Sequence, residues 1–205
     1  MTTPPSGPAA LAGAVALVTG GAQGIGRAIA LALADVGADV AILDLQPAPD
    51  TVMAIQTRGR RALSIVGNVA EREVAAAAVA RVLKELGRLD IVVNNAGISE
   101  RVGLEDLDEK TFNRTLDVTL KGTVVVTQAA YPHLKRDGGA IVNVASTSAM
   151  AGGTISFRAD HEDEGGRSGP AYAAAKAGVI GASKSLALEL AKRNVTVNEI
   201  GRAHV

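Results

Sequence analysis

A glycine-rich turn near the amino terminus constrains the fold more than any other feature of this sequence. The apolar run Ala14–Thr19 leads directly into Thr19-Gly-Gly-Ala-Gln-Gly-Ile-Gly26, and Gly24–Val36 has the composition of a helix that ends at Gly37. A strand, a glycine turn and a helix in this order let the backbone approach a pyrophosphate at the helix N-terminus. The pattern predicts a dinucleotide-binding unit. A glycine turn without this context would indicate only a tight connection.

The rest of the chain continues the alternation of apolar runs with helical segments. Further strands are expected at Asp39–Asp44, Ala62–Gly67, Asp90–Asn95, Ala140–Ala145 and Val195–Asn198. Further helices are expected at Thr51–Arg60, Glu71–Leu86, Asp108–Lys135 (interrupted near Gly122 or Pro132) and Pro170–Lys192. Continuous apolar runs are typical of parallel strands that are buried on both faces. The alternation therefore predicts an α/β fold, a Rossmann-like doubly wound parallel sheet between two helix layers.

Polar residues stand where several of the expected strands end. These are Thr19–Gly20, Asp44, Asn68, Asn94–Asn95 and Ser146. The ends of parallel strands meet at one edge of the sheet, where open α/β proteins bind ligands. The binding site is therefore expected at this edge.

Asp44 ends the second expected strand and bears on the choice of dinucleotide. A carboxylate there can accept hydrogen bonds from both hydroxyls of the adenosine ribose and would repel a 2′-phosphate. The neutral Gln23 offers no compensating positive charge. The sequence therefore favours NAD over NADP. Three arginines between residues 58 and 61 could modify that preference, and a simple turn aspartate is the alternative reading.

Tyr172 and Lys176 lie four residues apart in the Ala-rich segment Ala171–Gly178. At this spacing the two side chains share one face of a helix. A neighbouring ammonium group favours the phenolate form of a tyrosine, which suits the tyrosine to proton transfer near neutral pH. The alternative is an unrelated pair on a surface helix.

The composition excludes several classes of protein. Of the 205 residues 47% are hydrophobic and 20% are charged, which fits one globular domain with an aliphatic core. Basic and acidic residues number 21 each, so no broad basic field for nucleic acid is present. The chain has no cysteine, and no apolar run is long enough to span a membrane. Residues 1–12 look like a loose leader rather than a signal peptide, so a cytoplasmic location is expected.

The motifs together resemble those of the short-chain dehydrogenase/reductase family. Thr19–Gly26, Asn94–Gly97, Ser146 and the Tyr172–Lys176 pair occur in the family's order, and the similarity extends from about Leu11 to Asn198. More narrowly, the chain resembles the branch that includes 3-oxoacyl-carrier-protein reductases and many alcohol and hydroxysteroid dehydrogenases. The resemblance implies hydride transfer between a nicotinamide cofactor and a carbonyl or secondary alcohol substrate.

The resemblance also implies roles for individual residues. Tyr172 matches the general acid/base, Lys176 the lysine that tunes this tyrosine and holds the nicotinamide ribose, and Ser146 the serine that binds the substrate oxygen. The matching cofactor-binding positions are Gly20, Gln23, Gly24, Ile25, Gly26, Asp44, Asn68, Val69, Asn95, Ala96, Gly97, Tyr172 and Lys176. Asn68 stands where an aspartate is more usual, and its amide oxygen can still accept from an adenine amino group.

Three features depart from the family pattern. Thr119 precedes Leu-Lys-Gly where the family has a catalytic asparagine, so the proton relay is expected to be rearranged. Residues 153–169 look like an insertion, and the His161 region within it is expected to be a solvated loop beside the substrate site, with no metal site. The domain is expected to end at Asn198, followed by a non-native tail at residues 199–205, without the family's last strand and substrate lid.

The leading hypothesis is therefore an oxidoreductase that uses NAD, or less favourably NADP, with a Ser-Tyr-Lys site. A dinucleotide-binding protein without turnover, acting as a sensor or scaffold or being an inactive fragment, is the alternative. Epimerase or dehydratase chemistry on a nucleotide sugar is less favoured. The resemblance further implies a homodimer or homotetramer that pairs the 108–135 and 170–192 helices. Small residues between Ala171 and Ala187 suit that pairing, and they equally suit packing on the sheet.

Overall fold

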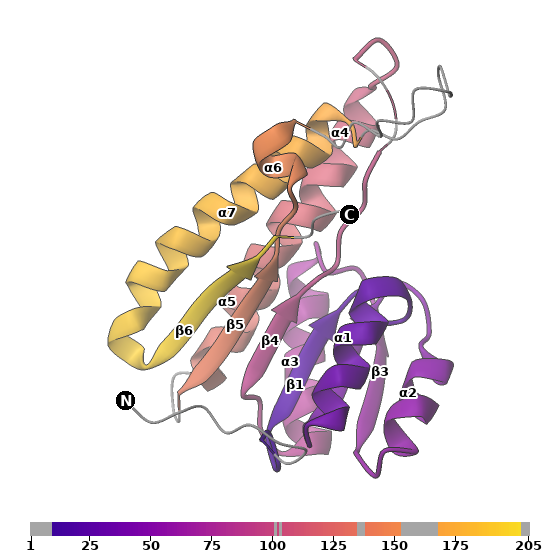
Figure 1. The fold of residues 1–205 in the computed structure, drawn as a ribbon, viewed down its shortest axis with the longest axis vertical. Coiled ribbons are helices and arrows are strands. Elements are labelled where there is room, and N and C mark those ends of the chain that lie inside the picture. The colour runs from indigo at the N-terminus through magenta and orange to yellow at the C-terminus, as the bar shows by residue number, and fades with distance from the viewer. Residues whose placement is uncertain (1–9, 101, 103, 135–137, 153–167, 202–205) are drawn as a thin grey trace.

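Six parallel strands form the centre of the molecule (Figure 1). The computed structural model describes residues 10–100, 102, 104–134, 138–152 and 168–201. Along the sheet the order is β3-β2-β1-β4-β5-β6, so the direction of winding reverses between β1 and β4. The strands are β1 (Val15–Thr19), β2 (Asp39–Asp44), β3 (Ala62–Val66), β4 (Ile91–Asn94), β5 (Gly139–Val144) and β6 (Val195–Ile200).

Helices cover both faces of the sheet. The α-helices are α1 (Gly24–Asp35), α2 (Pro49–Gln56), α3 (Arg72–Leu86), α4 (Glu109–Leu116), α5 (Gly122–Leu134), α6 (Ser148–Ala151) and α7 (Pro170–Leu190). A π-helical segment, η1 (Asp117–Lys121), joins α4 to α5, and a 3-10 turn, η2 (Ala191–Arg193), follows α7. Helices α1 and α2 pack on one face, and α3, α5 and the end of α7 pack on the other. The predicted doubly wound α/β fold is confirmed.

The central strands are buried on both faces, as their continuous apolar runs predict. All five residues of β1 are buried. Successive side chains of a strand point to opposite faces, so Leu17 packs in the cluster beneath α3 and α5, whereas Val18 packs in the cluster beneath α1 and α2. β1 therefore joins the two halves of the core and holds the glycine turn that follows it in a fixed place.

Two helices differ from their expected bounds by two residues or more. α2 begins at Pro49, a residue type suited to the first helical turn, and ends at Gln56 rather than at Arg60. The chain turns after the helix, and Gly59 adopts a left-handed conformation with φ +72°. α7 ends two residues before Lys192 because the last turn tightens into η2. The short helix α6 was not expected.

The long helical segment after β4 is interrupted near Gly122 and not at Pro132. The interruption is the π-helical segment η1, which directly precedes Gly122. Pro132 lies inside α5 near its end without ending the helix. A π segment adds one residue to a helical turn and rotates the side chains that follow. Thr119 lies on this segment and is fully buried.

The structure bears on the expected C-terminal tail, whereas most of the expected leader and insertion lie outside the described residues. β6 continues beyond Asn198, since Glu199 pairs with Asn143 and Ile200 with Val144 in parallel register. The strand therefore includes the first two residues of the segment that we expected to be a tail. The leader up to residue 9, residues 153–167 of the insertion and residues 202–205 lie outside the described residues. Within the described part of the chain, no helix combines the length and apolar character needed to cross a membrane.

Candidate functional site

The glycine turn lies at the carboxyl end of β1, at the point where the strand order reverses. Gly20 and Gly24 have positive φ values of 66° and 56°, which side-chain-bearing residues rarely adopt. A Cβ atom on Gly26 would overlap with the carbonyl oxygen of Gly20 and would approach Nδ2 of Asn95 to 2.5 Å. The turn therefore requires glycine for both its conformation and its close contacts. It leaves the N-terminal end of α1 open to a ligand.

The segment after β4 is bonded directly to the glycine turn. Nδ2 of Asn95 donates hydrogen bonds to the carbonyl oxygens of Thr19 (3.0 Å) and Gly20 (3.1 Å). The hydroxyl of Thr19 accepts from the backbone N–H groups of Asn95 and Ala96, each at 3.0 Å. These bonds hold the two loops side by side and form one wall of a pocket.

A pocket of about 570 Å³ extends along this edge of the sheet. All thirteen residues predicted to bind the cofactor line it. The sequence analysis missed eight further lining residues: Leu43, Leu45, Gln46, Gly67, Ile98, Val118, Val144 and Ala145. Most of them directly neighbour a predicted residue in the chain, so a wider window around each strand end would have found them. Val118 neighbours Thr119 and reaches the pocket from η1, whereas Gln46 and Val144 each lie two residues from a predicted site residue.

Asp44 lies at one end of the pocket, and its carboxylate already organises the backbone there. Oδ2 accepts a hydrogen bond from the N–H of Ala22 at 2.9 Å, and Oδ1 accepts one from the N–H of Gln46 at 3.0 Å. Each oxygen keeps a further lone pair for a ligand. Asp44 thus fixes the glycine turn and also presents negative charge to the pocket.

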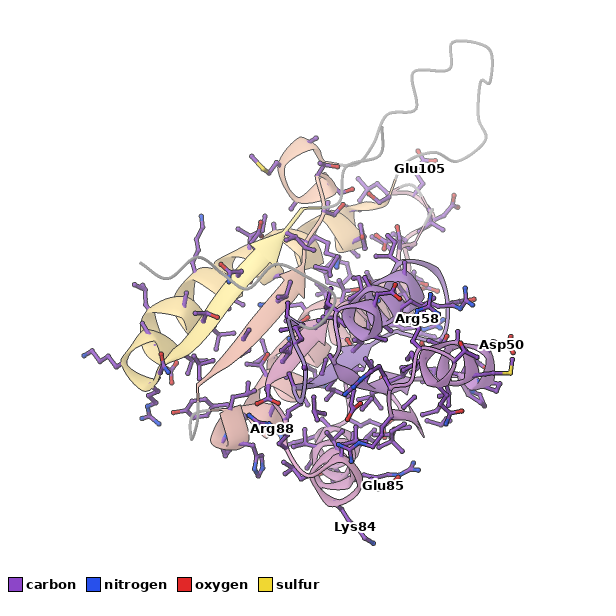
Figure 2. All side chains as sticks on the ribbon, turned by 60° about the horizontal axis from the view of Figure 1, so that its bottom comes forward. Asp50, Arg58, Lys84, Glu85, Arg88 and Glu105 are labelled. Carbon is purple, nitrogen blue, oxygen red and sulfur yellow. The ribbon has the colours of Figure 1, made fainter. Side chains whose placement is uncertain are left out.

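The three arginines that could have altered the preference for NAD lie at the opposite edge of the sheet. Arg58 pairs with Asp35 at the end of α1 (2.7 Å). Arg60 and Arg61 pair with Asp39 at the start of β2, at 2.8 Å and 2.7 Å. In Figure 2 the side of the molecule that bears the amino ends of the strands is turned toward the viewer, and Arg58 is labelled on it. Among the described residues that line the pocket, Lys176 is the one with a positive charge.

Asn68 ties its loop to the start of α3. Its Oδ1 accepts from the N–H of Ala70 at 3.1 Å, and its Nδ2 donates to Oε1 of Glu71 at 3.2 Å. One lone pair of Oδ1 remains for a ligand. An adenine amino group could still be accepted there, while the loop itself stays fixed.

Tyr172 and Lys176 lie on one face of α7, as their spacing predicts. Nζ of Lys176 is 5.7 Å from the centre of the Tyr172 ring. The lysine is only 3% exposed, and its ammonium group donates to the carbonyl oxygen of Val144 at the end of β5. Both side chains line the pocket, so the helix presents a phenol and an ammonium group together at the sheet edge.

Ser146 lies two residues after the end of β5 and is 8% exposed. Its Oγ accepts a hydrogen bond from the N–H of Ser148 at 3.1 Å, which leaves the hydroxyl proton free to be donated. Ser146 does not itself line the described pocket, but Val144 and Ala145 immediately before it do.

Thr119 does not line the described pocket but lies buried on η1, bonded to the segment that follows β4. Its hydroxyl accepts from the N–H of Ile98 (3.2 Å) and donates to the carbonyl oxygen of Ile98 (3.3 Å). A Cβ placed on Gly97 would lie 3.4 Å from Oγ1 of Thr119 and 3.6 Å from Nζ of Lys176. Thr119 and Lys176 therefore both lie beside Gly97, which itself lines the pocket.

Among the small residues of α7, Gly178 packs within this chain, whereas Ala174, Ala177 and Gly181 are exposed. A Cβ on Gly178 would lie 2.7 Å from a methyl group of Leu120, so α7 lies directly against η1.

Within the described residues, no group of three or more histidine, aspartate or glutamate side chains could hold a metal ion. The insertion around His161 lies outside the described residues.

Strand order, glycine turn and pocket together define a doubly wound, Rossmann-like α/β protein. The family model described as short chain dehydrogenase matches residues 14–205. The chain belongs to the short-chain dehydrogenase/reductase family and is an oxidoreductase. Members of this family use NAD or NADP, and the pocket and glycine turn fit such a dinucleotide.

Individual relatives agree with this assignment. The chain is 36% identical over 187 residues to (2S)-[(R)-hydroxy(phenyl)methyl]succinyl-CoA dehydrogenase subunit BbsD of Thauera aromatica, covering 90% of this chain and 70% of that protein. It is 38% identical to a 3-oxoacyl-[acyl-carrier-protein] reductase of Staphylococcus aureus, with 90% and 72% covered. Carveol dehydrogenase from Mycobacterium avium, solved in complex with NAD, superposes with a TM-score of 0.79 at 29% identity, with 92% and 70% covered.

Proposed function

We propose that this protein transfers a hydride between NAD and a carbonyl or secondary alcohol substrate through Ser146, Tyr172 and Lys176. The observation that carries the proposal is the shared position of Tyr172, Lys176 and the glycine turn along one pocket. A bound nicotinamide would supply or accept the hydride at its C4 atom. The protein contributes orientation of the reactants and control of the proton.

Each residue has a defined task in this scheme. In reduction, Tyr172 donates its phenolic proton to the carbonyl oxygen as the carbonyl carbon gains the hydride, and in oxidation it takes that proton back. Ser146 donates its free hydroxyl proton in a hydrogen bond to the same oxygen. Lys176 stabilises the phenolate that remains and can donate to a ribose hydroxyl. Its ammonium group is already oriented by the carbonyl of Val144.

The preference for NAD rests on Asp44. Its carboxylate can accept from the adenosine ribose hydroxyls and would repel a 2′-phosphate. The paired arginines at the far edge of the sheet offer no compensation. We therefore expect tighter binding of NADH than of NADPH, measured by fluorescence titration of each cofactor.

A substrate panel followed by nicotinamide absorbance tests the activity. The names of the relatives suggest acetoacetyl-coenzyme A and carveol as probes, each with NAD(H) and NADP(H). We expect turnover of at least one probe and its loss in Tyr172→Phe. Turnover that is unchanged in Tyr172→Phe would overturn the proposal.

The alternative is a dinucleotide-binding protein without turnover, and the contacts of Thr119 favour it. Both hydrogen bonds of its hydroxyl go to Ile98, so Thr119 is less free than an unbonded side chain to relay a proton. Tight NADH binding with no turnover across the panel would support this alternative. A gain of turnover in Thr119→Asn would then identify the relay as the missing part.

A homodimer or homotetramer built on α4, α5 and α7 is also part of the proposal. Val124 of α5 and Leu188 of α7 are apolar and exposed, which supports a contact surface on these helices. Light scattering with size-exclusion chromatography tests it. Exclusively monomeric protein at micromolar concentration would contradict it.

A further inference from the structure

Helix α7 carries Tyr172 and Lys176, yet it begins without a cap of its own. The N-cap residue is Gly169, which has no side chain, and the first helical residue is Pro170, which has no N–H. The N–H of Ala173 donates to the carbonyl oxygen of Gly169 at 3.2 Å. The N–H of Tyr172, one residue earlier, needs an acceptor from outside the helix.

Glu100 supplies that acceptor from a distant part of the chain. Its Oε1 accepts from the N–H of Tyr172 at 2.9 Å, and its backbone carbonyl oxygen accepts from the N–H of Gly169 at 3.0 Å. Glu100 is 8% exposed. Two hydrogen bonds thus join the loop after β4 to the first turn of the helix that holds the tyrosine. In Figure 1 this end of α7 lies close to α6 and α4.

The fit between the two segments is specific. A Cβ on Gly169 would lie 2.6 Å from Oε1 of Glu100, so a residue with a side chain there would displace the carboxylate. A helix N-terminus stabilises a negative charge, which offsets part of the cost of burying it. Oε2 of Glu100 is buried without a hydrogen-bond partner among the described residues. Among the described residues, the carboxylate is therefore held through Oε1.

The same loop is fixed at its other end to the pocket. Ile98 is bonded through both backbone groups to Thr119, and Gly97 lines the pocket beside Lys176. Residues 97–100 are therefore a short segment that lines the pocket at one end and is hydrogen-bonded to the backbone of Tyr172 at the other. A change at Glu100 would be transmitted to the position of the tyrosine.

We propose that Glu100 is a positioning residue that sets where Tyr172 stands against the pocket. The proposal rests on the proposed function of Tyr172 as proton donor and acceptor. Glu100 contacts the backbone of Tyr172 and not its phenol, so its contribution is geometric. Misplacing a catalytic group by about 1 Å can cost about 100-fold in rate.

Two substitutions separate the hydrogen bond from the bulk of the side chain. Glu100→Gln keeps an oxygen that can accept from Tyr172, and Glu100→Ala removes it. We expect Glu100→Ala to lower kcat by about 10- to 100-fold, with NADH affinity within about threefold, and Glu100→Gln to stay within about threefold in both. The reaction is followed with whichever of acetoacetyl-coenzyme A or carveol the wild type turns over. Glu100→Asp, which is one methylene shorter, replaces Glu100→Ala if that variant does not fold.

Asp108 provides a matched control. It caps α4 in the same way, because its Oδ1 accepts from the N–H of Thr111 at 2.6 Å, but it does not contact Tyr172. Asp108→Ala should lower the melting temperature and leave kcat within about twofold. A purely structural role for Glu100 would give Glu100→Ala the same outcome as Asp108→Ala, and that result would overturn the proposal.

A second readout does not depend on catalysis. Amide hydrogen exchange at Tyr172 should be faster in Glu100→Ala than in the wild type, and close to the wild type in Glu100→Gln. Unchanged exchange at Tyr172 in Glu100→Ala, or equal impairment of the two variants, would overturn the proposal. Absence of turnover in the wild type would overturn the proposed function instead, and the exchange experiment would still decide the role of Glu100.

Discussion

The side-chain amide of Asn95 donates to the carbonyl oxygen of Gly20 at 3.1 Å and thereby joins two loops that lie 75 residues apart. The position of Gly26 beneath this bond is the tightest point of the turn. Any side chain there would meet both the Gly20 carbonyl and the Asn95 amide. The pocket wall therefore depends on the absence of a single Cβ atom.

Gly26→Ala should weaken NADH binding by about 30-fold or more, because the turn must open by the width of a methyl group. Fluorescence titration measures the change. Gly181→Ala is the matched control, since a Cβ there would have no described atom within 4 Å and Gly181 lies inside α7. That variant should bind NADH normally and gain about 0.5–1 kcal/mol of stability. Equal affinity in the two variants would contradict the assignment of the turn.

Tyr172→Phe should lower kcat by about 100- to 10,000-fold, the usual contribution of general acid/base catalysis. NADH affinity should stay within about threefold, because the ring still lines the pocket. Tyr131→Phe is the control, since Tyr131 is the other tyrosine of the chain and its hydroxyl accepts from Arg193, outside the pocket. Similar rates in both variants would exclude Tyr172 as the proton donor.

Asp44→Asn should reduce the discrimination between NADH and NADPH. The substitution keeps the shape of the side chain but removes the charge that would repel a 2′-phosphate. We expect NADH to bind about 5- to 20-fold more weakly and NADPH to bind as well as before or better. Parallel titrations of the two cofactors measure the ratio. An unchanged ratio of NADH affinity to NADPH affinity would show that Asp44 is not the origin of the preference.

Asn143 should be important for stability rather than for chemistry. Its fully buried side chain accepts from Asn94 and donates to Ser183, each at 2.8 Å, and so links β4, β5 and α7. Asn143→Ala leaves both partners without that bond and should cost about 2–4 kcal/mol in urea unfolding. Ser183→Ala removes one bond and should cost about 1–2 kcal/mol. An equal loss in the two variants would argue against a connected network.

Asp39 should make the fold sensitive to acid. Burial raises its pKa, but hydrogen bonds from the backbone and side chain of Arg61 and the charges of Arg60 and Arg61 outweigh burial and hold the pKa below 3.8. The folded-state pKa is thus lower than the unfolded one. The contribution of Asp39 to stability is complete above the unfolded-state value and is lost as the pH falls below about 4 through the folded-state value.

Urea unfolding between pH 7 and pH 3 measures this dependence. Asp39→Asn should be less stable than the wild type at neutral pH, and the difference should shrink in acid. A difference that stays constant across this range would show that Asp39 does not carry the dependence.

Local patterns in the sequence were sufficient for much of the fold and the site. The alternation of apolar runs with helical segments predicts the six strands, because short continuous apolar runs between turn residues are typical of buried parallel strands. The glycine turn predicts the phosphate-binding loop, and the spacing of Tyr172 and Lys176 places them on one helix face, because both depend on residues close in the chain. The bounds of α2 and the π-helical form of η1 were not predicted, since turns and packing decide them.

The sequence by itself determined the order of the elements and the identity of thirteen of the residues that line the pocket, because neighbouring residues in the chain set both. Only the tertiary structure decided which distant groups meet there. It joined Glu100 to the backbone of Tyr172, Asn95 to Gly20, and Thr119 to Ile98. It also placed Arg60 and Arg61 at the edge remote from the pocket. Contacts across many residues depend on strand register and helix packing, which no local pattern encodes.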